Sequence, residues 1–294
     1  MSILFINLRA SPSGGMVAGE ATSWDDGTRY VSPQEFANRI AGRNVVFVTH
    51  GFNVDQANGI QDLTTWSDRY ALPDSWIYVG ILWPGDCRLE IFVDYVYEGP
   101  EAISSGQLLA NYLNQYAKQA QSYSFVAHSL GARMVLEAVR GLESDTQCVV
   151  LMAGAIEDDC FAREYADAAA KISRIHVVAS RCDRVLEWAF PAGNLIGEIV
   201  MHGHPYDRSP LGRNGPARPT PPNLSIDSWQ IPDGWNFGHT DYLPGQAIAP
   251  ELPLPVPAPG PDSGVPVDLT NLSNEVWKPA WSAGAATTFL LHKP

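Results

Sequence analysis

Short, nearly continuous apolar runs alternate along this chain with segments of helical periodicity, and this alternation most constrains the fold. Strands that are apolar on both faces are typical of parallel sheets covered by helices. Such runs occur at MSILFINLR (1–9), NVVFVTH (44–50), WIYVGILW (76–83), YSFVAH (123–128), CVVLMAGAI (148–156) and RIHVVAS (174–180). The sequence therefore predicts a three-layer α/β fold with a mostly parallel central sheet and helices on both faces.

The segments between the runs supply the expected helices. Residues 55–70 can form one helix, and residues 101–120 bring their apolar side chains to one helical face. LGARMVLEAVRGL (130–142) predicts a helix that ends near Gly141, and an Ala-rich helix is expected between the last two strands. Ligands of such sheets bind at the carboxyl ends of the strands, so we expect the chemistry there.

Composition excludes some classes of function. The chain has 294 residues, 45% of them hydrophobic, and a formal net charge of −13, which argues against a nucleic-acid or anionic-membrane surface. No apolar run reaches the roughly 18 residues of a membrane helix, and the N-terminus lacks the basic region of a signal peptide. The cysteines are widely spaced and form no CxxC pair, which favours buried thiols in a reducing compartment: Cys87, Cys148, Cys160 and Cys182. We therefore expect a cytoplasmic protein without a membrane span.

Proline and glycine content divides the chain. Residues 1–245 are predicted to form one α/β domain, within which the loop-rich region 187–222 is predicted to form a short cap. Proline then recurs through PELPLPVPAPGP, so residues 246–294 are predicted to be a Pro-rich tether followed by a C-terminal helix and arm.

The stretch AHSLG (127–131) stands where an apolar strand ends and an amphipathic helix begins. A nucleophile on such a sharp turn adopts a strained backbone conformation and requires small residues two positions before and after it. Gly131 meets this need and Ala127 adds only a methyl group. Ser129 is therefore a candidate nucleophile, although a serine here could also be an ordinary helix N-cap.

HGFN (50–53) follows the strand NVVFVT directly. The loop after this strand usually supplies one backbone donor of an oxyanion hole, and the residue after the nucleophile supplies the other. These donors would be Phe52 and Leu130. Gly51 lies where the chain must turn close to the reacting atom.

Two further polar residues complete the candidate site. Asp183 follows the strand RIHVVAS, and His239 lies in the late loop FGHTDYL. The order along the chain is thus Ser129, Asp183, His239. Glu157, Asp158 and Asp159, which follow the preceding strand, are alternative positions for the acid.

These motifs together resemble the α/β-hydrolases, in particular a bacterial group of unknown function, over about residues 40–245. The resemblance rests on VTHGFN, the strand ending in Trp83-Pro84, AHSLGAR, the late acid and an HTDY-like histidine. It implies that Ser129 attacks a carbonyl, that His239 takes its proton and that Asp183 orients His239, with no metal or organic cofactor.

Several histidines and tryptophans resemble site residues but are not assigned a catalytic role. His128 adjoins Ser129, but its position on the turn directs it away from the serine hydroxyl. His202 and His204 have a metal-like spacing but no acidic or cysteine partner at a useful distance, so we interpret them as loop or pocket-wall residues and expect no metal site. Several tryptophans are equally compatible with a cleft lining and with the core: Trp83, Trp188, Trp229 and Trp235.

We therefore expect a serine hydrolase acting on a small-molecule ester. The same residues would serve an amide, thioester or lactone substrate, and the sequence identifies neither the natural substrate nor the oligomeric state. The alternative is a catalytically silent scaffold that binds a partner, for example through the Pro-rich tail.

Overall fold

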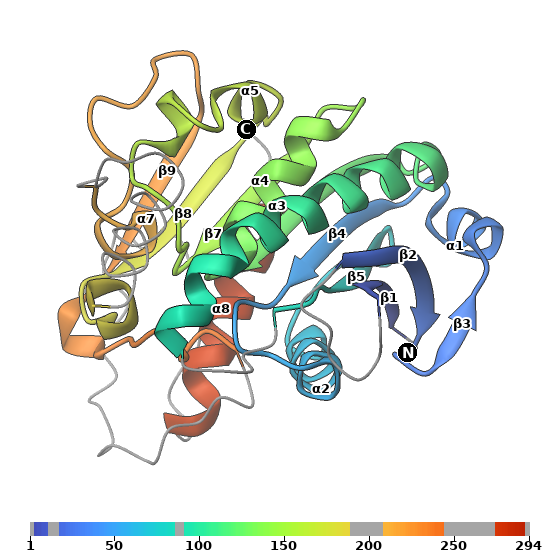
Figure 1. Ribbon diagram of the computed structural model, residues 1–294, viewed down its shortest axis with the longest axis horizontal. Coiled ribbons are helices and arrows are strands. Elements are labelled where there is room, and N and C mark those ends of the chain that lie inside the picture. The colour runs from blue at the N-terminus through green and yellow to red at the C-terminus, as the bar shows by residue number, and fades with distance from the viewer. Residues whose placement is uncertain (1–2, 11–17, 86–90, 189–207, 244–273, 292–294) are drawn as a thin grey trace.

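The structure of the protein is a computed structural model (Figure 1). It describes residues 3–10, 18–85, 91–188, 208–243 and 274–291. Cys87, His202, His204, most of the predicted cap and the Pro-rich tether lie outside these residues.

The sheet has nine strands in the order β3-β2-β1-β5-β4-β6-β7-β8-β9. The pairings from β1 through β5, β4, β6, β7 and β8 to β9 are all parallel, whereas β2, near one edge, pairs antiparallel with both β1 and β3. The bounds are β1 Leu4–Arg9, β2 Ala18–Asp25, β3 Arg29–Val31, β4 Asn44–Thr49, β5 Trp76–Leu82, β6 Ser122–His128, β7 Cys148–Met152, β8 Ile175–Ser180 and β9 Ile226–Ile231.

Helices join these strands and cover both faces of the sheet. On one face α1, α3, α4 and α5 pack in sequence against one another, whereas α2 and α8 contact each other on the opposite face (Figure 1). The bounds are α1 Pro33–Ile40, α2 Gln56–Ser67, α3 Ile91–Tyr116, α4 Gly131–Gly141, α5 Ala166–Ala170, α7 Leu211–Asn214 and α8 Asn274–Leu291, with 3₁₀ turns at Cys160–Ala162 and Asp233–Trp235. The predicted three-layer α/β fold is confirmed.

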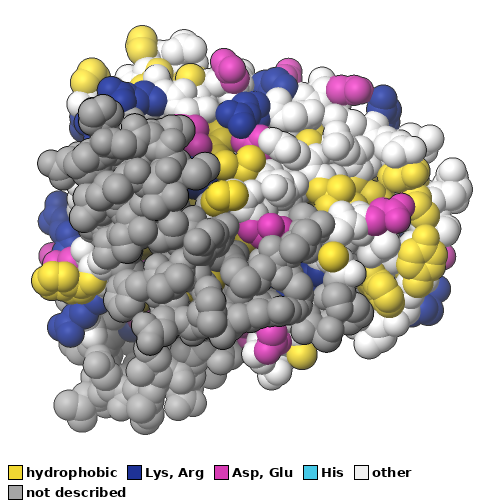
Figure 2. Space-filling model, in the orientation of Figure 1, with side chains coloured by type: hydrophobic (Ala, Val, Ile, Leu, Met, Phe, Trp, Pro, Cys, Tyr) yellow, Lys and Arg dark blue, Asp and Glu magenta, His cyan; other side chains and the backbone are white. Residues whose placement is uncertain are grey.

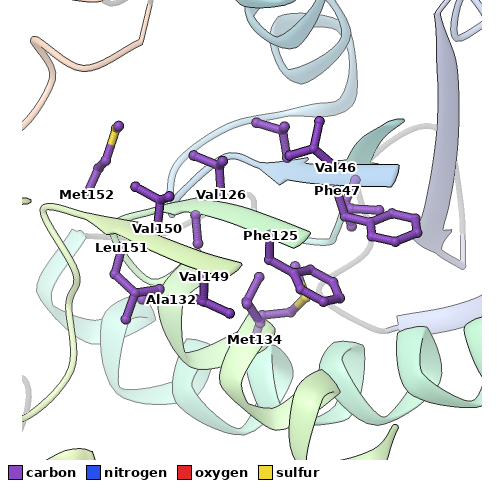
Figure 3. Close-up of a cluster of buried hydrophobic side chains, with 14 of the residues drawn as sticks. Val46, Phe47, Phe125, Val126, Ala132, Met134, Val149, Val150, Leu151 and Met152 are labelled. Carbon is purple, nitrogen blue, oxygen red and sulfur yellow. The ribbon is translucent and has the colours of Figure 1, made fainter. Parts of the chain in front are cut away.

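The central strands are apolar on both faces because both faces are covered. Val149 and Leu151 of β7 face α4, while Val150 and Met152 point to the other side of the sheet (Figure 3). All four side chains are fully buried. Alternate residues of a strand point to opposite faces of the sheet. A strand that is covered on both faces therefore needs an unbroken run of apolar residues.

Several elements differ from their predicted bounds. Helix α3 begins at Ile91 instead of residue 101 and passes Pro100, whose fixed φ is compatible with a helix although its missing N–H removes one hydrogen bond. Strand β7 ends at Met152, because Ala153 has a positive φ of 47° and turns the chain. Strand β9 was not predicted: IDSWQI is a half-exposed edge strand with polar residues.

Helix α8, near the C-terminus, packs on the domain. The Phe289 ring stacks on His176 of β8 at 4.4 Å between centroids, and the Phe289 carbonyl accepts a hydrogen bond from the Cys148 thiol of β7. The Ser282 hydroxyl donates to the Tyr242 carbonyl at 2.6 Å. This helix therefore belongs to the same packed body as the sheet.

The described surface carries charges of both signs. On the face shown in Figure 2, Lys and Arg side chains lie among Asp and Glu side chains and form no single basic patch within the described residues. In the same described segments, every helix falls short of the length or the hydropathy that crossing a bilayer requires.

Candidate active site

Ser129 occupies the turn between β6 and α4, at the carboxyl edge of the sheet. Its φ is 55°, in the left-handed region that non-glycine residues rarely adopt. Its backbone N–H donates to the Met152 carbonyl, and its carbonyl accepts from the Ala155 N–H, both at 3.0 Å. These two hydrogen bonds to the end of β7 and the residues after it hold the serine in a strained backbone conformation. Such a conformation persists only where the surrounding structure fixes it.

Two glycines let other segments approach this turn. A Cβ atom on Gly131 would lie 2.5 Å from the His50 carbonyl oxygen, and one on Gly51 would lie 2.6 Å from the Ser129 Cβ. Neither separation is compatible with a side chain. The loop after β4 therefore runs directly against the turn that carries Ser129.

Two side chains hold the loop of residues 50–54, one from the last residue of β1 and one from the residue that follows β5. The Trp83 indole donates to the His50 carbonyl at 3.0 Å, and the Arg9 guanidinium donates to the Val54 carbonyl at 2.8 Å. Trp83 is fully buried, so it supports this loop from within the core. Phe52 lies in the loop, and Leu130 stands at the start of α4; their role as oxyanion donors stays a prediction.

His239 lies between the other two predicted residues. Its Nε2 is 2.7 Å from the Ser129 hydroxyl, and its Nδ1 is 2.7 Å from Asp183 Oδ2. A carboxylate only accepts, so Nδ1 carries the proton and Nε2 presents a lone pair to the serine. This tautomer suits an imidazole that receives a proton from Ser129.

Asp183 follows β8 and is completely buried. Its Oδ1 accepts the Leu186 backbone N–H at 2.9 Å, which leaves Oδ2 for His239. Burial, followed by the negative charge of Asp183, raises the pKa of the nearby Tyr242 well above its usual value. The acid therefore occupies a site with little access to water.

Two of the three alternative acids are paired with arginines. Asp159 pairs with Arg163 at 3.1 Å and with Arg208 at 3.3 Å. Glu157 pairs with Arg133 at 2.9 Å. Burial, with the charge of Asp159, raises the pKa of Asp158. The described partners of Glu157 and Asp159 are thus arginines.

His50 and His128 are buried beside the site. Burial lowers the pKa of each to about 3, assisted by the charge of Arg9 for His50 and by that of His239 for His128. His128 Nε2 contacts the His239 carbonyl at 2.7 Å, and His50 Nδ1 contacts the Gly51 carbonyl at 2.8 Å. Both rings are therefore neutral and bound to backbone near neutral pH.

The tryptophans that the sequence left open between a cleft lining and the core differ in burial. Trp235 is buried and packs edge-on against Trp281 of α8, Trp229 is half-buried and Trp188 is exposed. Within the described segments, His, Cys, Asp and Glu side chains form no cluster of three suited to a metal ion.

Sequence reasoning missed Arg9 and Lys278. Arg9 ends a fully buried strand and is itself buried, and its charge at the end of a mainly apolar run was the available signal. Lys278 of α8 donates to Asp241 and to the Asn236 carbonyl on either side of His239. No local pattern in the sequence indicated that this lysine would reach the site.

Comparison with known proteins agrees with this architecture. Residues 32–252 match the family described as "Alpha/beta hydrolase of unknown function (DUF900)". None of the curated proteins compared with the chain matches it significantly.

Two solved structures are similar. An uncharacterized protein from Bacillus cereus ATCC 10987 has 12% identity and a TM-score of 0.40, over 72% of this chain and 56% of that one. The chain thus spans little more than half the length of that protein. Esterase PE8 has 16% identity and a TM-score of 0.37, over 68% of this chain and 86% of that one. At these values neither structure bears on the chemistry of this chain.

Proposed function

Because this chain belongs to the α/β-hydrolases of unknown function, we propose that it is a serine hydrolase that cleaves carboxylic esters through an acyl-enzyme intermediate. The observation that carries the proposal is the pair of 2.7 Å hydrogen bonds linking Asp183, His239 and Ser129. A nucleophile bonded to a base, which a third group orients, is the arrangement that activates a serine.

In the first half-reaction, Ser129 Oγ attacks the ester carbonyl carbon while His239 Nε2 takes the hydroxyl proton. The carbonyl oxygen becomes an oxyanion in a tetrahedral intermediate. Collapse of this intermediate breaks the bond to the alkoxy oxygen, which receives the proton from His239 and leaves as an alcohol. Asp183 stabilises the transient imidazolium and keeps the ring in the productive tautomer.

The oxyanion requires donors that are in position before it forms. We assign this role to the backbone N–H groups of Phe52 and Leu130. The contacts of Trp83 and Arg9 with the loop of residues 50–54 support the assignment, because a loop held in this way needs little reorganisation during the reaction.

The second half-reaction repeats these steps with water. His239 takes a proton from a water molecule, whose oxygen attacks the acyl carbon, and the proton then passes to Ser129 Oγ as the acid product leaves. The chemistry uses only groups of this chain and one water for each ester cleaved.

A fluorophosphonate probe tests the proposal, because an activated serine reacts with it rapidly. The wild type should be labelled at Ser129, mapped by peptide mass spectrometry, and should hydrolyse a short p-nitrophenyl ester. Ser129→Ala should lose the label and nearly all turnover, although the remaining groups can leave a rate above that of water. Ser67→Ala, at the end of α2, provides a matched control with full labelling.

Labelling retained in Ser129→Ala would assign the nucleophile elsewhere. A wild type that neither reacts nor turns over any ester would instead favour the silent scaffold. The preferred acyl bond is measured separately, by comparing an ester, a thioester and an anilide with the same acyl group. A kcat/KM highest for the anilide would identify an amidase.

A further inference from the structure

His239 is carried by residues 232–243, which we call the histidine loop. The backbone hydrogen bonds described within this loop are local, joining Trp235 to Pro232, Asn236 to Asp233 and Asp241 to Gly238. Asn236 has a positive φ of 47°. Bonds of this kind shape the loop, but they do not set its position relative to Ser129 and Asp183.

Helix α8 supplies contacts on both sides of His239. Lys278 Nζ donates to the Asn236 carbonyl at 2.8 Å and to Asp241 Oδ2 at 2.6 Å. The same carboxylate oxygen accepts the Gly238 backbone N–H at 2.6 Å. Lys278 thus connects the residue three positions before His239 with the residue two positions after it.

The surroundings favour a well-defined geometry for this contact. The Lys278 side chain is only 12% exposed, and Asp241 is 30% exposed. The ammonium group lies 5.4 Å from the centre of the Phe237 ring, and Trp281 packs edge-on against the same ring. A charge-assisted bond that is partly shielded from water is stronger and more directional than one on an open surface.

Helix α8 also lies beyond the residues that match the family, which end at 252. A segment outside the matched region therefore contacts the loop that carries the proposed catalytic base.

We propose that Lys278 is a positioning residue for His239. By bridging Asp241 and Asn236, it fixes the histidine loop so that Nε2 faces Ser129 and Nδ1 faces Asp183. The inference rests on the proposed function, because it assigns Lys278 to the same hydrolytic site. A displacement of about 1 Å at a reacting group can cost roughly 10²-fold in rate, so loss of the bridge should slow the chemical step.

The test compares Lys278→Met with Lys278→Arg, which keeps the charge and the donors. Lys118→Met is the matched control, because Lys118 forms an exposed ion pair with Glu143. All variants are assayed at a temperature at which thermal melts show them fully folded. We expect Lys278→Met to lower kcat and the rate of phosphonylation roughly tenfold or more, with KM within about twofold. Lys278→Arg should retain most of the rate, and Lys118→Met should match the wild type.

Wild-type rates in Lys278→Met, or equal losses in Lys278→Met and Lys278→Arg, would overturn the proposal. If Lys278→Met does not fold, Asp241→Asn replaces it, since the amide oxygen still accepts the Gly238 N–H but no longer carries the negative charge that strengthens the bond from the ammonium. The same loss of kcat is expected for Asp241→Asn, and an unchanged kcat would refute the bridge.

A spectroscopic readout separates this inference from the proposed function. The proton between His239 Nδ1 and Asp183 should give a downfield NMR resonance, assigned by its loss in His239→Ala. We expect Lys278→Met to shift or broaden it and Lys278→Arg to preserve it. An unlabelled wild type would refute the serine hydrolase, whereas an unchanged resonance in Lys278→Met would refute the positioning role.

Discussion

The Nε2 atom of His128 lies 2.7 Å from the carbonyl oxygen of His239. A carbonyl only accepts, so His128 donates through Nε2–H. Because burial lowers the pKa of His128 to about 3, the ring is neutral near pH 7 and carries its one proton on Nε2. The residue before the proposed nucleophile thereby ties the end of β6 to the histidine loop, which carries the proposed base.

Removal of this donor should impair turnover. We expect His128→Ala to reduce kcat roughly tenfold, because the His239 carbonyl then loses its hydrogen-bond donor. A buried acceptor left without a donor costs about 1–3 kcal/mol, which favours displacement of the histidine loop. His128→Gln offers an amide N–H and should restore part of the rate. Steady-state kinetics at a pH above 7 provides the measurement. Equal kcat values for the alanine variant and the wild type would show that the bond is dispensable.

The same histidine should make stability depend on pH. Burial, then the charge of His239, lowers the pKa of His128 to about 3 from 6.5, so between these values the unfolded chain binds more protons than the folded one. The free energy of unfolding should therefore fall as the pH falls through this window, by up to about 1.4 kcal/mol per pH unit for this group. Urea denaturation of wild type and His128→Gln between pH 7 and pH 4.5 measures the difference. Parallel curves for the two proteins would contradict the assigned cause.

The choice of acid is tested by two matched substitutions. Asp183→Asn should lower kcat by about 10⁴-fold, because an amide that donates to Nδ1 favours the wrong tautomer of His239. Asp159→Asn should cost less than about tenfold, since Asp159 pairs with Arg163 and Arg208. Ester hydrolysis by both variants, with circular dichroism to verify folding, distinguishes them. The reverse order of losses would move the acid to the end of β7.

Gly51 should tolerate no side chain. A Cβ atom there would lie 2.6 Å from the Ser129 Cβ and 3.1 Å from His128 Nδ1, so Gly51→Ala must displace the loop that contains Phe52. We expect kcat to fall by roughly 10²-fold, the typical cost of losing one oxyanion donor. Gly99→Ala in α3 is the control, because its Cβ meets no described atom within 4 Å. Normal turnover by Gly51→Ala would argue against Phe52 as a donor.

Much of the fold could be read from the sequence. The runs predicted at 44–50, 76–83, 123–128 and 174–180 correspond to β4, β5, β6 and β8. These strands lie inside the sheet and are covered on both sides, so burial itself demands the continuous apolar pattern that predicts them. The turn at Ser129 was equally accessible, because its small flanking residues are a local requirement of the backbone.

Edge elements were harder to predict. Strand β9 has half-exposed and exposed residues along most of its length, and its sequence IDSWQI lacks an apolar run. Its pairing with β8 depends on backbone hydrogen bonds, which any residue except proline can form and which leave little trace in the sequence.

The sequence by itself determined that Ser129 and Asp183 follow buried strands and that His239 lies in a late loop, and hence which residues were candidates for the site. Only the tertiary structure decided that His239 faces Asp183, from which it is separated by 56 residues, and not Asp159. It also decided that Lys278 reaches the histidine loop across 37 residues. The physical reason is that strand and turn formation depend on neighbours along the chain, whereas a hydrogen bond depends on a distance of about 3 Å that only the packed fold specifies.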